Sequence, residues 1–284
     1  MEKLLVSAEE LARHLDDPAW VVFDTRHDLT DPKAGREEYE HEHVPGAYFL
    51  HTDDDLSGPL TGTNGRHPLP DIDAFAARIN RCGVGPGTQV VAYDDLGGAY
   101  AVRLWWMLRW LGHERAALLD GGFPQWLREG RPVSSEVPPA RAGSFVPRPR
   151  LGATVDASFV ERFREDPAVK LVDARAAQRY SGEKETLDPV AGHVPGSLHR
   201  FWQRNLGPDG RFKSPAALRE EWLAFLGGAS AEQSVHMCGS GVTACHNLFA
   251  LELAGLGEGR LYPGSWSEWC ADPSRPVATG MQAR

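Results

Sequence analysis

Hydrophobic and polar positions follow two alternating patterns along this chain. Short apolar, β-branched runs at 20–23 and 169–172 predict buried strands, whereas longer stretches such as 72–81 and 215–226 have the spacing of amphipathic helices. Strands that alternate with helices predict a mostly parallel sheet covered by helices on both faces. We therefore expect an α/β fold in which ligands bind beyond the carboxyl ends of the strands.

Three sequence motifs occur twice, in the same order, within the 284 residues. The repeated pairs are DTR at 24–26 with DAR at 173–175, HVPG at 43–46 with HVPG at 193–196, and GGFPQW at 121–126 with PGSWSEW at 263–269. A repeat of this length indicates a duplicated domain, because solenoid repeats have periods of about 20 to 50 residues. We predict one α/β domain over 1–135, a proline-rich linker over 136–153, and a second α/β domain over 154–284.

A cysteine stands at one predicted strand end, followed by small and glycine-rich residues. The run 233–237 predicts a short buried strand and 244–256 predicts an apolar helix, so Cys238 opens a strand-to-helix loop. Backbone N–H groups in such a loop can converge on an anion at the positive end of a helix, which favours the thiolate. An inert core cysteine before a tight turn is the alternative for an isolated Cys-Gly pair.

The first copy lacks this thiol. The offset of 143 residues that joins Gly112 to Gly255 and Trp126 to Trp269 places Asp95 opposite Cys238. We therefore expect the first domain to be non-catalytic, although its residues could still line the active site.

Composition and charge exclude several classes of protein. The net charge of −9 argues against a nucleic-acid partner, which requires a basic patch. No apolar segment approaches 20 residues and no basic-then-apolar stretch opens the chain, so we expect no membrane partner and a reducing, cytoplasmic location.

The other cysteines and the histidines near the loop have simpler interpretations. With four cysteines in the whole chain, a disulfide framework is not expected, and we interpret Cys82, Cys245 and Cys270 as structural. A metal site at His236, Cys238, Cys245 and His246 lacks a Cys-x-x-Cys pair. We expect no metal and no organic cofactor.

The loop sequence distinguishes between two kinds of cysteine chemistry. A cysteine phosphatase needs an arginine after five loop residues to grip phosphate bidentately, and this chain has Ala244 there. Sulfur transfer needs no such arginine, because a persulfide forms on the cysteine and the loop N–H groups stabilise its outer sulfur.

On these motifs, the chain resembles the two-domain rhodanese-type sulfurtransferases over almost its whole length. Thiosulfate enzymes of that family resemble one another in having Arg-Lys after the cysteine, whereas Gly239-Ser240 here resembles the 3-mercaptopyruvate sulfurtransferases. The resemblance implies an enzyme that takes sulfur from a small-molecule donor, 3-mercaptopyruvate, releases pyruvate, and passes the sulfur to a thiol, a thioredoxin-like protein or cyanide. A thiosulfate:cyanide sulfurtransferase is the alternative, and a non-enzymatic persulfide carrier or interaction module is a second one.

The same resemblance implies roles for individual residues. Cys238 matches the nucleophile, and Ser240, His67 and Asp53 match a relay that manages the proton on the leaving enolate, for which histidine is the usual residue. Arg179 matches a residue that binds the substrate carboxylate. The loop that surrounds the persulfide is matched by Gly239, Gly241, Val242 and Thr243 together with Ser240.

Two departures from the family pattern affect the choice of donor. Related mercaptopyruvate enzymes have a second arginine nine residues after the first, where this chain has Asp188, and Lys184 is a poor substitute because it offers a point charge instead of a planar fork. Pro263 stands where the family often has aspartate. The mechanism also requires that the Cys238 sulfur be reachable from solvent.

Overall fold

The computed structural model describes residues 3–281, which divide into two compact units. Unit 1 contains the chain up to Gly58, then Leu69–Arg150 and Pro208–Phe212, and unit 2 contains Pro59–Pro68, Leu151–Gly207 and the chain from Lys213 onward. The division therefore differs from two contiguous domains, because the short segments 59–68 and 208–212 each belong to the unit formed mainly by the other half of the chain. The first of these segments carries His67.

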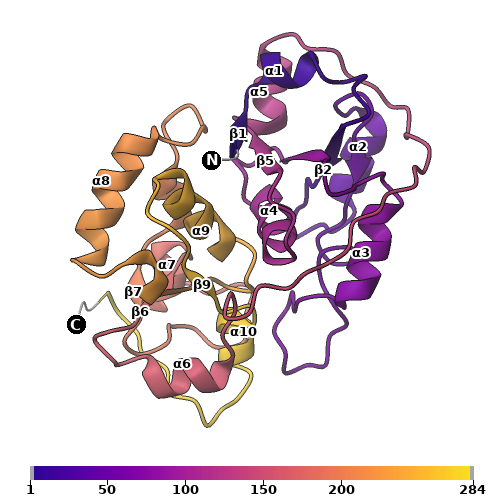
Figure 1. Ribbon diagram of the computed structural model, residues 1–284. Coiled ribbons are helices and arrows are strands. Elements are labelled where there is room, and N and C mark those ends of the chain that lie inside the picture. Colours follow the sequence, from indigo (N-terminus) through magenta and orange to yellow (C-terminus); the bar gives the residue numbers. More distant parts are fainter. Residues whose placement is uncertain (1–2, 282–284) are drawn as a thin grey trace. The chain divides into compact units, whose positions relative to one another are not determined.

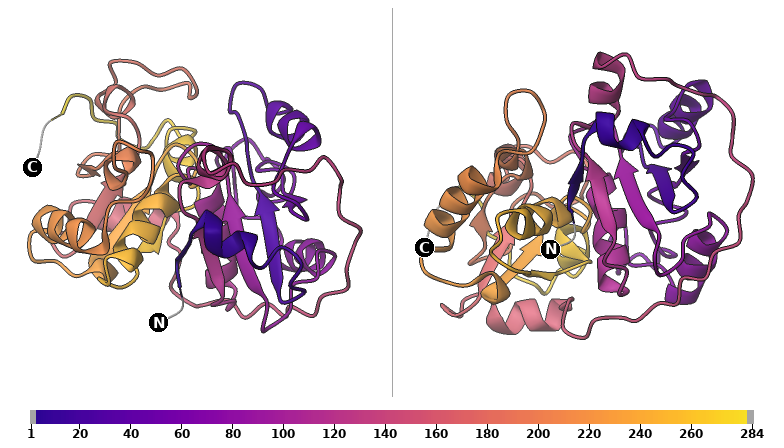
Figure 2. Two further views of the ribbon diagram at one scale, coloured as in Figure 1. Left: turned by 90° about the horizontal axis from the view of Figure 1, so that it is seen from above. Right: turned by 45° about the horizontal axis from the view of Figure 1, so that its top comes forward.

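A five-stranded sheet with the strand order β1-β5-β4-β2-β3 forms the centre of unit 1. Every pairing in it is parallel, as predicted. The sheet is flanked by helices on both faces (Figures 1 and 2). The elements of unit 1 are β1 (Leu5–Val6), α1 (Ala8–Ala12), β2 (Trp20–Asp24), α2 (Ala34–His41), β3 (Tyr48–Phe49), α3 (Ile72–Asn80), β4 (Gln89–Tyr93), α4 (Ala101–Trp110), β5 (Ala116–Leu119) and α5 (Gly122–Arg128).

Unit 2 repeats this plan with a four-stranded parallel sheet in the order β7-β6-β8-β9. Its elements are α6 (Ala157–Phe163), β6 (Lys170–Asp173), α7 (Ala177–Ser181), β7 (Leu198–His199), the 3₁₀ turn η1 (Trp202–Asn205), α8 (Pro215–Leu226), the 3₁₀ turn η2 (Ala231–Gln233), β8 (Ser234–Met237), α9 (Ala244–Leu253), β9 (Arg260–Leu261) and α10 (Ser265–Trp269). The predicted α/β class is confirmed for both units.

Local sequence signals set the ends of the helices. Helix α8 begins after Ser214, whose side chain accepts the N–H of Ala217, and it has Pro215 in its first turn. It ends at Gly227, which adopts the left-handed conformation with φ +60°. The predicted helix over 215–226 is thereby confirmed. Among the described residues, no helix is both long enough and apolar enough to cross a membrane.

The repeated Asp-x-Arg motif is a buried structural ion pair. In unit 2, Arg175 Nη2 donates to Asp173 Oδ2 at 2.7 Å, and its guanidinium lies 4.7 Å from the centre of the Trp266 ring. In unit 1, Arg26 Nη2 donates to Asp24 Oδ2 at the same distance. Because both aspartates end a central strand, each pair fixes the edge of the sheet where ligands bind.

The predicted linker runs in extended form along unit 1 and contains no helix or strand. Its backbone donates from Arg141 to the Arg81 carbonyl at 2.8 Å, and from Arg148 to the Leu111 carbonyl at 2.8 Å. These hydrogen bonds explain why unit 1 extends to Arg150, beyond the predicted end of the first domain at 135.

Candidate active site

Cys238 follows β8 directly and opens the loop 238–243 that leads into α9. Strand β8 lies between β6 and β9 in a parallel sheet, so the loop lies beyond the carboxyl ends of central strands. The strand-loop-helix geometry predicted from the sequence is therefore present. We call residues 238–243 the cysteine loop.

Tight backbone contacts determine the shape of the cysteine loop. Gly241 has a φ of +78°, and a Cβ at this position would overlap the carbonyl oxygen of Pro263, so only glycine fits. The first N–H groups of α10 also hold the loop, because Trp266 donates to the Cys238 carbonyl at 3.0 Å and Ser267 donates to the Gly239 carbonyl at 2.9 Å. The second copy of the tryptophan motif thus positions the cysteine backbone.

The Cys238 sulfur accepts a backbone hydrogen bond inside the loop. The Gly241 N–H lies 3.1 Å from Sγ, as expected for a loop that stabilises negative charge on sulfur. Cys238 is only 2% exposed, however, so the expectation that its sulfur is reachable from solvent is wrong for this structure. A reagent can reach this sulfur only if the residues that cover the loop move.

Ser240 and His67 form a hydrogen bond although they are 173 residues apart. The distance from Ser240 Oγ to His67 Nδ1 is 2.6 Å, and both residues are about 5% exposed. His67 lies in the segment 59–68, which belongs to unit 2 together with the cysteine loop. The structure therefore brings together three of the predicted site residues: Cys238, Ser240 and His67.

Arg179 also faces the cysteine loop, but carboxylates already surround it. Its Nη1 and Nη2 atoms lie 3.3 and 3.4 Å from the position that a Cβ on Gly239 would take. Its Nε lies 3.0 Å from both oxygens of Glu185, and Nη2 donates to Asp188 Oδ2 at 2.9 Å. Burial raises the pKa of Glu185, but the hydrogen bond from Arg179 and the N–H of Leu187 outweigh it, so the pKa is lowered and Glu185 is a carboxylate.

Sequence reasoning missed Arg66, the residue before His67. Its Nη2 lies 2.7 Å from the position of a Cβ on Gly239, and its Nη1 donates to Asp188 Oδ1. The sequence signal that could have indicated it is the pairing of an arginine at 66 with an aspartate where related enzymes have an arginine. Lys184, a poor substitute by its chemistry, makes no side-chain hydrogen bond or ion pair with the described residues.

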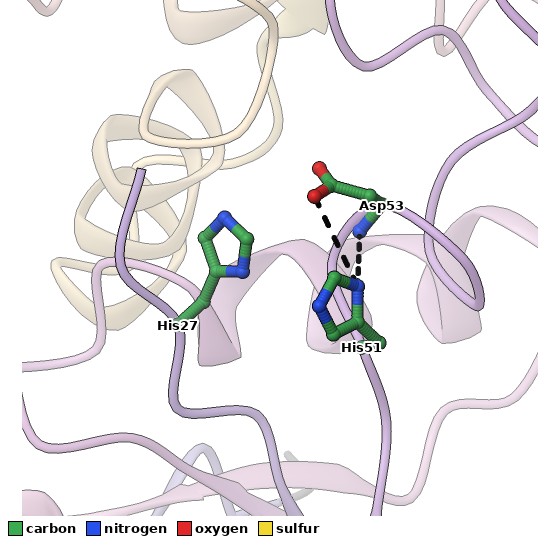
Figure 3. Close-up of side chains that lie close together, drawn as sticks. All are labelled: His27, His51 and Asp53. Carbon is green, nitrogen blue, oxygen red and sulfur yellow. Dashed lines mark hydrogen bonds and ion pairs between the residues drawn. The ribbon is translucent and has the colours of Figure 1, made fainter. Parts of the chain in front are cut away.

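Asp53 lies in unit 1, on a turn stabilised by His51 (Figure 3). His51 Nε2 must carry a proton because it donates to the carbonyl of Pro32 at 2.7 Å, and Nδ1 accepts the Asp53 N–H at 3.1 Å. His27, His51 and Asp53 offer ligand atoms within 4.8 Å of one another, but a metal ion at Nδ1 would displace this backbone hydrogen bond. The hydrogen bonds of His51 therefore account for the turn without a metal ion. The relay role of Asp53 stays a prediction.

The register of the strands corrects the predicted counterpart of Cys238. Asp24 pairs with Tyr93 just as Asp173 pairs with Met237, so the residue after the strand in unit 1 is Asp94 and not Asp95. The offset of 143 fails here because the loop of unit 1 has one more residue before its helix begins. Asp95 instead lines an open cavity of about 340 Å³.

The Asp94 carboxylate is bound by the backbone N–H groups of the loop that follows it. This carboxylate accepts backbone N–H groups from Leu96, Gly98, Tyr100 and Ala101 at 2.8 to 2.9 Å. The first unit has thus replaced the thiol with a carboxylate that occupies the ring of inward-facing N–H groups. No sulfur chemistry is possible at that position.

The remaining cysteines form no disulfide among the described residues, and all three are buried. Burial raises the pKa of both Cys82 and Cys270 to about 11, so each is a protonated thiol at neutral pH. Cys245 donates to the Gly241 carbonyl at 3.4 Å and packs under the loop. These surroundings fit the structural role expected for the three residues.

Comparisons with known proteins identify the family to which the chain belongs. The model of the rhodanese-like domain matches residues 7–129 and 156–272. A probable 3-mercaptopyruvate sulfurtransferase of Pseudomonas aeruginosa is 46% identical over 278 residues, which cover 97% of this chain and 98% of the relative. The thiosulfate sulfurtransferase of Rattus norvegicus is 34% identical over 99% of this chain and 97% of its own length.

A solved structure extends the likeness to three dimensions. The crystal structure of the 3-mercaptopyruvate sulfotransferase SseA from Escherichia coli has a TM-score of 0.80 at 30% identity and covers 94% of this chain and 100% of that protein. The expected resemblance is thereby confirmed. The chain belongs to the rhodanese-like family and carries two copies of its domain.

Proposed function

We propose that this protein is a 3-mercaptopyruvate sulfurtransferase that acts through a persulfide on Cys238. The observation that carries the proposal is the hydrogen-bonded pair of Ser240 and His67 beside the cysteine loop. This pair provides a hydroxyl and an imidazole that can move a proton, which a mercaptopyruvate donor requires and a thiosulfate donor does not. The similarity to mercaptopyruvate enzymes over nearly the whole chain supports the same conclusion.

The first half-reaction conserves electrons and protons without a cofactor. The Cys238 thiolate attacks the donor sulfur, an S–S bond forms, and the C–S bond breaks with its electron pair passing to C3 as the enolate of pyruvate. The proton of the donor thiol then reaches C3 through His67 and Ser240, which leaves an anionic persulfide. The Gly241 N–H, already 3.1 Å from Sγ, stabilises the negative charge, as do the other loop N–H groups as the outer sulfur forms.

In the second half-reaction an acceptor removes the outer sulfur. A thiolate of a small molecule or of a thioredoxin-like protein, or cyanide, attacks that sulfur, and Cys238 returns as a thiolate. The four free cysteines suit a reducing compartment, and we place the protein in the cytoplasm on that basis. Arg179 orients the donor carboxylate, whereas a role for Asp53 is supported by the family resemblance alone.

The decisive experiment compares two donors on the purified protein. Pyruvate release from 3-mercaptopyruvate should exceed thiocyanate formation from thiosulfate and cyanide in kcat/KM, and Cys238→Ser should abolish both. Cys82→Ser in unit 1 is the matched control and should retain activity. A protein that accepts a persulfide but turns over neither donor would be a sulfur carrier, and the proposal would be wrong.

A thiosulfate sulfurtransferase is the second candidate. Two guanidinium groups face Gly239, and positive charge at the cysteine loop suits a dianionic donor. Against it, Glu185 and Asp188 contribute two negative charges to the same cluster. A higher kcat/KM with thiosulfate than with 3-mercaptopyruvate would establish this alternative.

A further inference from the structure

Two guanidinium groups reach the first glycine of the cysteine loop from different parts of the chain. Arg66 approaches from the segment before His67, and Arg179 approaches from helix α7. Their nearest nitrogens lie 2.7 and 3.3 Å from the Cβ position of Gly239. A side chain at 239 would require Arg66 to move away, so the glycine lets this guanidinium lie against the loop.

Asp188 joins the two arginines. Its Oδ2 accepts a hydrogen bond from Arg179 at 2.9 Å and its Oδ1 accepts one from Arg66, so one carboxylate bridges both guanidiniums. The Asp188 side chain is 2% exposed, and a buried carboxylate of this kind is stable only while it is paired. The bridge therefore fixes how far apart the two cations lie.

Arg66 keeps one edge of its guanidinium for another ligand. Within residues 3–281, Nη2 has no hydrogen-bond acceptor, and the side chain is 27% exposed. Arg179, in contrast, uses Nε and Nη2 on Glu185 and Asp188. Arg66 therefore has more guanidinium N–H groups available to bind a ligand beside the loop than Arg179 has.

The backbone of the segment places Arg66 and its neighbour together. The Arg66 N–H donates to Ser267 Oγ at 3.0 Å, and Gly65, with a φ of +82°, packs against the carbonyl of Gly264. The next residue is His67, which bonds Ser240. One short segment therefore delivers both a cation and the relay imidazole to the cysteine loop.

We propose that Arg66 is a donor-binding residue that, with Arg179, clamps the carboxylate of a monoanionic 2-oxo acid. This inference rests on the proposed function, because it assigns the group that recognises its substrate. The four charged side chains sum to zero, which favours a monoanion with good acceptor geometry over a dianion. Asp188 holds both guanidiniums beside Gly239, and guanidinium N–H groups bind carboxylate oxygens in a planar, directional way.

The experiment measures binding and turnover separately in Arg66→Gln and Arg66→Lys. In the Cys238→Ser background, the dissociation constant of hydroxypyruvate, which has the carboxylate but no sulfur, should rise about tenfold in Arg66→Gln and less in Arg66→Lys. Arg162→Gln, an exposed arginine of α6 before the amino end of β6, is the control and should bind like the parent. An unchanged constant in Arg66→Gln, or no binding in the parent, would overturn the inference.

Turnover distinguishes a binding role from a structural one. In the protein with Cys238 intact, Arg66→Gln should raise KM for 3-mercaptopyruvate about tenfold while kcat stays within about twofold, because a carboxylate clamp acts equally on ground and transition states. A fall in kcat at unchanged KM would mean that Arg66 only positions His67. If the parent binds hydroxypyruvate through Arg66 but releases no pyruvate, the proposed function fails, and only the assignment of Arg66 as a carboxylate-binding residue stands.

Discussion

His236 should make this protein markedly less stable in mild acid. It lies in β8, two residues before Cys238, and is fully buried beside Arg200 and Trp222. Ser234 Oγ gives its proton to the Ala231 carbonyl at 2.6 Å, so His236 Nε2 donates to Ser234 Oγ at 2.9 Å and the ring is neutral.

The magnitude follows from the pKa. Burial, and then the charge of Arg200, lower the pKa of His236 from 6.5 to about 3. Because the unfolded chain binds the proton first, the stability that the neutral ring provides is complete above pH 6.5 and is lost as the pH falls toward 3. A shift of this size corresponds to about 5 kcal/mol in total, or about 1.4 kcal/mol for each pH unit.

The assay is urea unfolding at several pH values between 4.5 and 7.5. Between pH 6 and pH 4.5 the free energy of unfolding should fall more steeply in the parent than in His236→Gln, whose amide can keep the hydrogen bond to Ser234. The difference in slope should approach one proton. His113 and His193 also have lowered pKa values and contribute equally to both proteins, so they cancel.

An exposed histidine provides the control for this experiment. His41→Gln changes an exposed histidine of α2 and should leave the slope of the parent unchanged. Equal slopes in the parent and His236→Gln would refute the reasoning, because they would mean that the folded protein accommodates the imidazolium without cost.

Three further predictions concern the site and its counterpart in unit 1. Ser240→Ala and His67→Gln should each lower kcat for pyruvate release about a hundredfold, and single-turnover rates near those of the parent would rule out the relay. Asp188→Asn adds one net positive charge beside the loop and should raise kcat/KM for thiosulfate relative to 3-mercaptopyruvate about tenfold; an unchanged ratio of the two donors would contradict the charge argument. Asp94→Asn should lower the free energy of unfolding by about 3 kcal/mol, because an amide cannot satisfy four converging N–H groups. Asp95→Asn is the control and should change this free energy by less than about 0.5 kcal/mol. Equal effects of the two substitutions would contradict the assignment of Asp94 as the counterpart of Cys238.

The sequence by itself determined the features that depend on local patterns. The repeated motifs indicated two copies of one domain, and the family match to residues 7–129 and 156–272 bears this out. Apolar runs between helical stretches indicated parallel sheets, since strand and helix periodicities differ. The placement of Cys238 between a strand and a helix followed from the same rule, because each step involves residues close together in the chain.

Contacts between distant residues depend on the tertiary structure, although the family resemblance already pointed to Ser240 and His67 as members of one relay. The hydrogen bond between Ser240 and His67 and the ion pair between Arg66 and Asp188 depend on the segment 59–68 being part of unit 2. Neither contact leaves a periodic signal in the sequence.

The choice of Asp94 over Asp95 as the counterpart of Cys238 was likewise settled by structure. The offset of 143 residues was taken from motifs that follow the loop, whereas the strand register aligns the residues directly before it. Because the loop of unit 1 has one extra residue, the two alignments differ by one position. The sequence therefore indicated the candidate thiol, and the folded chain determined which groups surround it, because side-chain chemistry is carried locally while proximity depends on how the whole chain packs.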